Sequence, residues 1–236
     1  MADLGPAGPG PLEYGIGALA LVDHHVHPAL AAETSAAEFE ALLTESDRPA
    51  PPGLTQFDSQ LGVAVRRWCA PVLDLEPFAS PGDYLARRAA LGPAEVTGRL
   101  LRASGTGHFL LDTGYVRPGL LDVAGMAQAA GVPAGEVVRL ESVAEQAVLA
   151  GDGSAAGFAD RFAEVLAREA AAAVGLKSIV GYRFGLDFDP EPPTTSEVTA
   201  AAGRWLGQIE AAGRVRVEDP VLLRHLLWAE IGRAHV

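Results

Sequence analysis

The sequence has little of several features that mark particular classes of protein. It contains one cysteine, Cys69, so no disulfide can form within the chain, which is typical of the reducing cytosol. No run of residues approaches the roughly 20 apolar residues of a membrane-spanning helix. The first residues, Met-Ala-Asp-Leu-Gly-Pro, lack the basic and apolar regions of a signal peptide. Together these absences predict a soluble, cytoplasmic protein.

Basic residues are scarce relative to acidic ones. The 236 residues include 18 Lys and Arg against 30 Asp and Glu, a formal net charge of −12. Nucleic-acid phosphates are bound by clustered basic surfaces, so no nucleic-acid partner is expected. No glycine-rich phosphate-binding loop follows a predicted strand. What the sequence does contain is 49% hydrophobic residues, enough for a sizeable core in one large domain or two small ones.

One stretch, residues 18 to 28, combines an apolar run with a cluster of histidines. Its sequence, ALALVDHHVHP, predicts a short buried strand that ends where the proline stops the ladder. Because side chains alternate along a strand, Asp23, His25 and His27 share one face. Two imidazoles at positions i and i+2 can converge on a metal ion, and neutral imidazole suits zinc and similar divalent ions. The stretch predicts a metal site; the alternative is a histidine-rich turn.

A long helical region follows this strand. One helix is expected from the capping box of Ser35 and Glu38, and others from Ser80-Pro81 and from Pro93 to about Ala103. The region from residue 30 to residue 105 is far longer than one crossover between strands needs. We therefore expect a helical insertion after the first strand.

The rest of the sequence alternates predicted strands with predicted helices. Three further apolar runs predict strands, at residues 109–112, 137–141 and 174–180. Helices are expected over residues 118–130 and 155–173, from the capping box of Thr194 and Glu197, and after Asp219. His225 is expected on the surface of the last helix, and His108 at the start of the second strand.

This order predicts an α/β fold with a parallel sheet of right-handed βαβ units. A doubly wound sheet fits the order as well as a barrel does. Polar residues near the strand ends, Asp112, Glu141 and Lys177, favour the barrel, because barrel enzymes collect such residues at one face. Lys177 is costly to bury within a strand unless it is paired or chemically altered; the alternative is that it reaches water. The fold expected is part of a (β/α)8 TIM barrel, with about four strands.

Several of these residues resemble a known family. Val22, Asp23, His25 and His27 fit the end of the first barrel strand in the metal-dependent amidohydrolase superfamily, apolar-apolar-Asp-x-His-x-His. Glu45 and the segments RLE and GLKSIVGYR are similar to an amidohydrolase-related branch that includes the hydrolase-like domain of nodulin- and FluG-type proteins. The resemblance runs from about residue 18 to residue 229.

The resemblance implies a barrel that holds a divalent metal, expected to be zinc, and that hydrolyses an amide-like or related bond of a small molecule. His25 and His27 carry over as metal ligands. Lys177 carries over as the fourth-strand residue that many relatives carbamylate to bridge two metals, so it is a candidate metal ligand and catalytic residue. The superfamily also contains decarboxylases and isomerases. A non-catalytic metal-binding module is the alternative from another class.

Four more residues are candidates for contact with the substrate. Asp112, Glu141 and Tyr182 are expected to orient it, although each could equally be a structural residue at a strand end. Arg183 is a candidate catalytic residue, because a cation at the mouth of the barrel would suit a carboxylate-bearing substrate.

The family's complete site also needs histidines from strands five and six and an aspartate from strand eight. Residues 1–229 are therefore expected to be the N-terminal part of such a barrel, inactive as this chain and prone to aggregate or self-associate through unpaired strand edges. The last seven residues, Glu230 to Val236, can be written back as codons that resemble a sequencing adapter. We expect this tail to be non-native.

Overall fold

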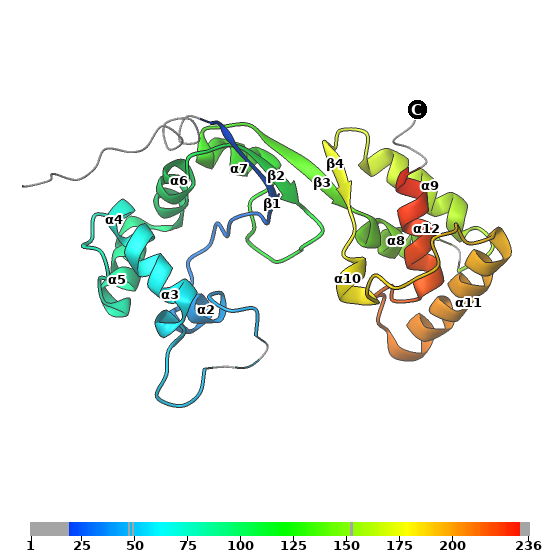
Figure 1. Ribbon diagram of the computed structural model, residues 1–236, viewed down its shortest axis with the longest axis horizontal. Helices are drawn as coiled ribbons and strands as arrows, with labels where there is room; N and C mark the ends of the chain where they lie inside the picture. The colour runs from blue at the N-terminus through cyan, green and yellow to red at the C-terminus, as the bar shows by residue number, and fades with distance from the viewer. Residues whose placement is uncertain (1–18, 47, 49, 152, 232–236) are drawn as a thin grey trace, which may run out of the picture. The chain divides into compact units, whose positions relative to one another are not determined.

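The computed structural model describes residues 19–46, 48, 50–151 and 153–231 (Figure 1). Within this part of the chain, four strands form one sheet in the order β1-β2-β3-β4. Their bounds are β1 Leu21–Val26, β2 Thr106–Asp112, β3 Ala134–Arg139 and β4 Gly175–Lys177. β3 and β4 pair in parallel, with Arg139 opposite Lys177. The α/β class is confirmed, and the sheet of parallel strands is consistent with part of a barrel.

The chain divides into two compact units. The first comprises Met1–His24, Ala29–Phe109 and Pro118–Ala134, and the second comprises His25–Pro28, Leu110–Arg117 and Gly135–Val236. The boundary passes through β1, β2 and β3, so each of these strands contributes residues to both units.

The first unit is mainly helical, and most of its helices lie between β1 and β2 in the sequence. Its helical segments are α2 Ala36–Ala41, η1 Gln56–Asp58, α3 Gln60–Ala64, η2 Val65–Cys69, α4 Ala70–Val72, α5 Pro81–Leu91, α6 Pro93–Ala103 and α7 Val123–Ala130. The capping box of Ser35 and Glu38 is present at the start of α2, and Ser80 caps α5, as expected. The core of this unit is aromatic: the rings of Phe39, Phe57 and Tyr84 lie within contact of one another.

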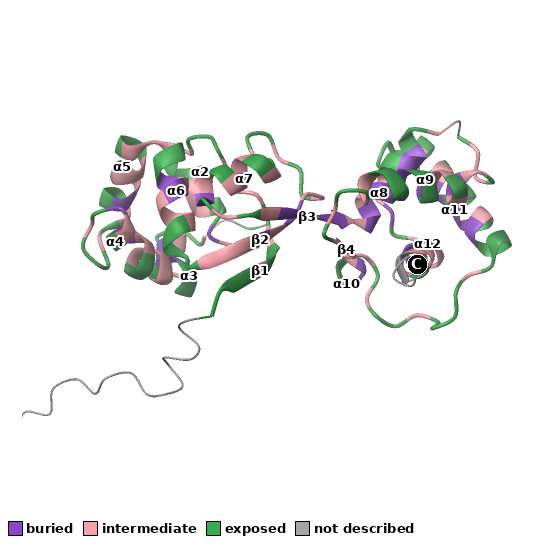
Figure 2. Cartoon of the chain, turned by 90° about the horizontal axis from the view of Figure 1, so that it is seen from above, coloured by how far each residue is buried: buried purple, intermediate pink, exposed green. Residues whose placement is uncertain are grey.

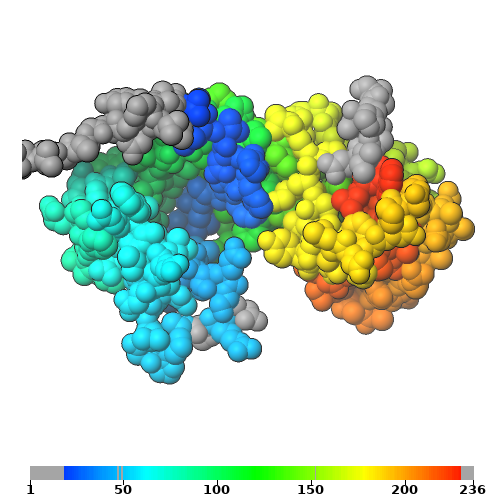
Figure 3. Space-filling model, in the orientation of Figure 1, coloured from blue at the N-terminus to red at the C-terminus, as the bar shows by residue number. Residues whose placement is uncertain are grey.

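The second unit is a group of helices around β4. Its helices are α8 Leu140–Leu149, α9 Phe158–Glu169, α10 Val180–Arg183, α11 Thr195–Ala212 and α12 Pro220–Ile231. α8, α9 and α11 turn buried faces toward one another (Figure 2), and β4 to α12, coloured yellow to red, lie against one another in Figure 3. Phe158, Phe162 and Trp205 are fully buried there. Burying a side chain of this size stabilises a fold by about 1.5–3 kcal/mol.

Several predicted elements differ from the structure. The predicted fourth strand, over residues 174–180, is shorter, because β4 ends at Lys177 and Val180 begins α10. The first strand was expected to be buried, but β1 lies at the sheet edge, and Leu21 and Val22 are 50% and 56% exposed. The predicted third strand ends early, because Leu140 begins α8, a buried helix that the sequence pattern did not reveal. The predicted helix over residues 118–130 begins only at Val123, where the Asp122 side chain accepts a hydrogen bond from the Gly125 amide.

Some expectations fall at the limits of the described chain. Residues 1–18, and residues 232–236 of the expected non-native tail, lie outside the described residues. α12 continues through Glu230 and Ile231, the first two residues of that tail. In the part of the chain that the structure describes, no helix is long and apolar enough to cross a membrane.

Candidate functional site

The two histidines predicted as metal ligands lie at the end of β1, within the second unit. The His25 and His27 rings are nearly perpendicular, at 86°, and their centroids are 6.3 Å apart. Both side chains are exposed, so a ligand can reach their nitrogens. The ring of Tyr115 lies 5.0 Å from that of His27, between ring centroids, and supports it from the loop after β2. Both histidines are therefore accessible, and the His27 ring packs against Tyr115.

A buried carboxylate from β2 lies beside these histidines. The Asp112 side chain is 2% exposed, and its Oδ2 lies 2.5 Å from an Arg139 guanidinium nitrogen and 3.0 Å from Lys177 Nζ. Burial raises the pKa of the Asp112 carboxyl, but hydrogen bonds from Arg139 and Lys177, and their positive charges, outweigh it and hold the pKa below its usual range. Asp112 is therefore an anion that pairs with two cations, Arg139 from β3 and Lys177 from β4.

Lys177 connects this ion-pair network to the histidines. Its Nζ lies 3.3 Å from His25 Nε2 as well as 3.0 Å from Asp112 Oδ2. On the other side of the network, Asp112 Oδ2 lies 3.9 Å from His27 Nδ1. The Lys177 side chain is only 20% exposed, and its charge is paired with the Asp112 carboxylate. We call His25, His27, Asp112, Arg139 and Lys177 the strand-end cluster.

A glycine makes room for the arginine of this cluster. A Cβ at Gly114 would lie 2.6 Å from Arg139 Cβ and 2.7 Å from its Nε, closer than such atoms approach in proteins. The Gly114 amide donates a 3.0 Å hydrogen bond to Asp112 Oδ1, the oxygen that Arg139 and Lys177 leave free. Both carboxylate oxygens of Asp112 are thus hydrogen-bonded, which fixes the orientation of the group.

The cluster fits a metal only in part. His25 and His27 are suitable donors on a rigid strand, and they are accessible. A catalytic zinc, however, needs three protein ligands besides water, and no group of three His, Cys, Asp or Glu side chains among the described residues could hold a metal ion. Lys177 lies close enough to His25 to join a site, but an ammonium group has no lone pair to offer.

Glu141 lies elsewhere than predicted. It occupies the first turn of α8 and not a strand end, and it is fully buried. Its Oε1 accepts hydrogen bonds from the Ser178 hydroxyl and, at 3.0 Å, from the Ile179 amide. Glu141 therefore holds the chain just after Lys177 in place, and in this structure it does not face an open site.

Tyr182 and Arg183, the two candidate residues on α10, are not brought to the cluster by the contacts of the second unit. Tyr182 is 82% exposed on α10. Arg183 lies 3.2 Å from Glu145 and donates to the Val217 carbonyl at 3.3 Å, with only 6% of its side chain exposed. Burial lowers the pKa of Arg183, although the Glu145 carboxylate opposes this. Arg183 is therefore not observed at the predicted position at the mouth of the barrel. Its side chain is buried, and its charge is paired with Glu145.

For two further residues, His225 and Arg139, the structure differs from what the sequence analysis expected. His225 was expected on the surface of its helix, but its ring packs against Phe158 and Phe162, at 6.5 and 5.9 Å between centroids. Arg139 was not singled out as a functional residue, although it pairs with Asp112. The position of Arg139 near the end of the predicted third strand was a signal that could have identified it. In the structure it is the last residue of β3 and lies opposite Lys177.

Comparisons with known proteins give one informative result. No family model and no curated protein matches the chain. Among solved structures, the chain is similar to a Lactobacillus casei ATCC 334 protein named "putative metal-dependent hydrolase", with a TM-score of 0.69 and 23% identity. The chain shares its fold with that protein. The match covers 94% of this chain and 58% of the L. casei chain, so this chain spans little more than half of that protein's length.

Proposed function

We propose that this chain is part of a metal-dependent hydrolase of the amidohydrolase type, in which His25 and His27 are metal ligands. The observation that carries the proposal is the convergence of His25, Asp112 and Lys177, from three different strands, within 3.3 Å contacts. Ionisable residues that meet at the ends of parallel strands are typical of barrel active sites. The fold shared with the L. casei protein supports the same class.

Each residue of the cluster has a distinct task in this proposal. A bound metal would supply an activated water and polarise the scissile bond of a small-molecule substrate, and imidazole ligands suit zinc and similar divalent ions. Asp112 holds Lys177 at 3.0 Å, and Arg139 fixes Asp112 from β3. Carbamylation of Lys177 would convert a cation into an anionic ligand.

The remaining candidate residues, Glu141, Tyr182 and Arg183, have different roles in the proposal. Glu141 positions the segment after β4 through Ser178 and Ile179. Tyr182 is exposed enough to contact a substrate. Arg183 is assigned a structural ion pair with Glu145 in place of a catalytic role.

A second candidate function is a non-catalytic metal-binding module. It is favoured by the shortage of ligands among the described residues, and by the pairing of Lys177 with Asp112, which leaves the lysine a cation. A decarboxylase or isomerase of the same superfamily would use the same first-strand histidines, so the cluster does not separate these reactions from hydrolysis.

Metal analysis and activity together test the proposal. The protein is purified and its metal content measured by mass spectrometry, for the wild type and for the His25→Ala/His27→Ala variant. His24→Ala is the matched control, because strand alternation places that imidazole on the opposite face. We expect stoichiometric metal in the wild type and the control, and loss of metal in the double variant. Metal-free, folded wild-type protein would refute the metal site.

Hydrolysis of a panel of small amides then separates the two candidate functions. Metal-dependent turnover that is lost in His25→Ala/His27→Ala and retained in His24→Ala supports the hydrolase. Bound metal without turnover of any amide in the panel supports the non-catalytic module.

A further inference from the structure

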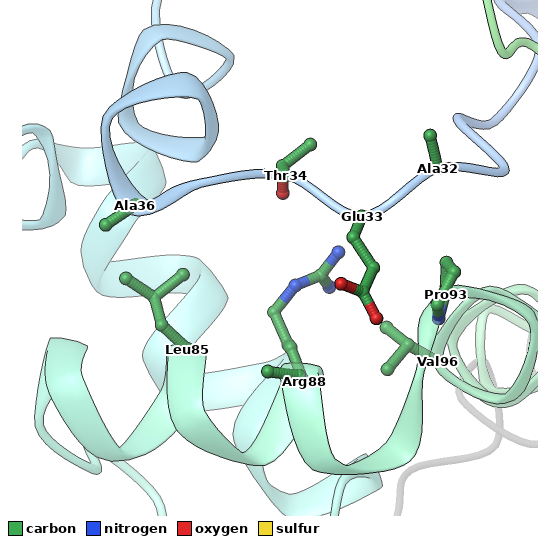
Figure 4. A pocket seen from close by; sticks show the side chains of 9 residues that line it. Ala32, Glu33, Thr34, Ala36, Leu85, Arg88, Pro93 and Val96 are labelled. Carbon is green, nitrogen blue, oxygen red and sulfur yellow. The ribbon is translucent and has the colours of Figure 1, made fainter.

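The first unit contains a pocket that the strand-end cluster does not use. It has a volume of about 250 Å³ and is lined by the loop before α2, by α5 and by α6. Figure 4 shows that Glu33, from the loop, and Arg88, from α5, extend into the same space from opposite sides. The rest of the lining is mainly aliphatic, including Leu85, Pro93 and Val96. The pocket thus combines two opposite charges with an apolar wall.

The two charges of this pocket are not paired with each other. Among the described residues, neither Glu33 nor Arg88 takes part in an ion pair at up to 4.0 Å. Other arginines of the same unit do: Arg87 and Arg99 both bind Asp74, at 2.5 and 2.7 Å. A carboxylate and a guanidinium that face one pocket without meeting are suited to a ligand that carries both opposite charges.

Arg88 is held in position by the aromatic core. Its guanidinium carbon lies 4.7 Å from the Phe39 ring centroid and 5.8 Å from that of Tyr84. A guanidinium stacked on a ring keeps its N–H edge available for a bidentate bond to a carboxylate. The arginine is therefore oriented before any ligand arrives.

A second cavity adjoins the first and is more apolar. It has a volume of about 210 Å³ and shares Ala32, Thr34, Arg88 and Val96 with the first. Its further lining includes Phe39, Leu42, Leu100 and Leu101. A ligand whose carboxylate lies on Arg88 can therefore place an apolar side chain in this second cavity. Each cavity alone is smaller than the roughly 300–1,000 Å³ of typical ligand sites, so the ligand must be small.

We infer that this double pocket binds a free α-amino acid with a medium-sized apolar side chain. Its carboxylate binds Arg88, its ammonium group binds Glu33, and its side chain occupies the cavity between α2 and α6. Thr34 lines both cavities and supplies a hydroxyl that can hydrogen-bond either charged end. The inference rests on the first unit alone and does not depend on the proposed metal-dependent hydrolysis.

Calorimetric titration of the 236-residue chain with three related compounds tests the inference. L-leucine carries both charges, N-acetyl-L-leucine lacks the ammonium group and L-leucinamide lacks the carboxylate. We expect L-leucine to bind about tenfold more tightly than either analogue, since each lost charge removes one charge-assisted bond. The inference is overturned if L-leucine does not bind, or binds no better than the two analogues.

Two variants assign the charges to their residues. Glu33→Gln should remove the preference for L-leucine over N-acetyl-L-leucine, and Arg88→Lys should reduce the preference over L-leucinamide. Glu76→Gln and Arg67→Lys are matched controls: Glu76 is exposed outside the pocket, and Arg67 also stacks on aromatic rings, those of Trp68 and Phe78. Because Glu33 is exposed, Glu33→Gln should fold even if Arg88→Lys does not. An unchanged preference in Glu33→Gln would refute the proposed site.

Discussion

Replacing Asp112 by asparagine should destabilise the second unit strongly. The substitution keeps the shape of the side chain but removes the anion that faces Arg139 at 2.5 Å and Lys177 at 3.0 Å. Breaking a buried ion pair from one side costs about 3–5 kcal/mol, because a charge is left without a partner. The side chains of Arg139 and Lys177 are 12% and 20% exposed and so keep some contact with water. We therefore expect the lower end of the range, about 3 kcal/mol.

Urea denaturation followed by tryptophan fluorescence measures this change in the second unit. Of the chain's 3 tryptophans, Trp68 lies in the first unit, so a Trp68→Phe background leaves Trp205 and Trp228 as reporters. With a slope of about 2 kcal/mol per molar urea, the transition midpoint should fall by about 1.5 M at unchanged slope.

Asp74→Asn is the matched control for Asp112→Asn. Asp74 also accepts from two arginines, Arg87 and Arg99, but its side chain is 60% exposed. Exposed ion pairs contribute little because water and salt screen them, so this variant should change stability only slightly. A loss below about 1 kcal/mol for Asp112→Asn, or equal losses for both variants, would refute the account of the cluster as a buried network.

Three further predictions concern other parts of the chain. Burial lowers the pKa of His225 in the folded chain, so on acidification the unfolded chain is protonated at this residue first. The free energy of unfolding should therefore fall as the pH drops below about 6.5. Acid titrations should show a weaker pH dependence in His225→Leu. Gly114→Ala should cost about 1–3 kcal/mol in urea denaturation, because the new methyl group would displace Arg139, whereas the exposed Gly207, with open space around it, should tolerate alanine better. The exposed edge residues Leu21 and Val22 should promote self-association of the 236-residue chain, and light scattering should show less of it in Val22→Lys; a strictly monomeric wild type would contradict this.

Local signals in the sequence were sufficient for much of the fold. The capping boxes at Ser35 and Thr194 predicted the starts of α2 and α11, because the bonds involved join residues three apart. α6 was predicted with its observed bounds, Pro93–Ala103, from its proline start and its helical spacing. Features determined by neighbouring residues in the chain could therefore be predicted.

Features determined by distant partners could not. α8 has no side-chain cap, and its many buried residues continue the apolar run of β3, so neither its start nor its period was visible. His225 lies in a helix with apolar residues on several sides, so the sequence did not show which side of the helix is buried. In the structure, Phe158 and Phe162 of α9 pack against the side that carries His225. Arg183 was read as a free cation because Glu145, its partner, lies on another helix.

The same distinction applies to the strand-end cluster. His25, His27, Asp112 and Lys177 could be selected individually, since each lies at or near the end of a predicted strand. That Lys177 lies between His25 and Asp112 depends on the order and register of the strands. Arg139 was overlooked because its role depends on the gap that Gly114 leaves.

The charge balance of the cluster links its stability to the proposed function. Asp112 is the one anion against Arg139 and Lys177, so these three side chains together carry one net positive charge beside His25 and His27. A positive charge 3.3 Å from His25 Nε2 repels a divalent cation and so weakens its binding to the two imidazoles. Carbamylation of Lys177 would reverse the sign of the balance, because it replaces the second cation with an anion. If His25 and His27 bind a metal as proposed, its affinity should therefore depend on the chemical state of Lys177, whose amine lies 3.3 Å from His25 Nε2.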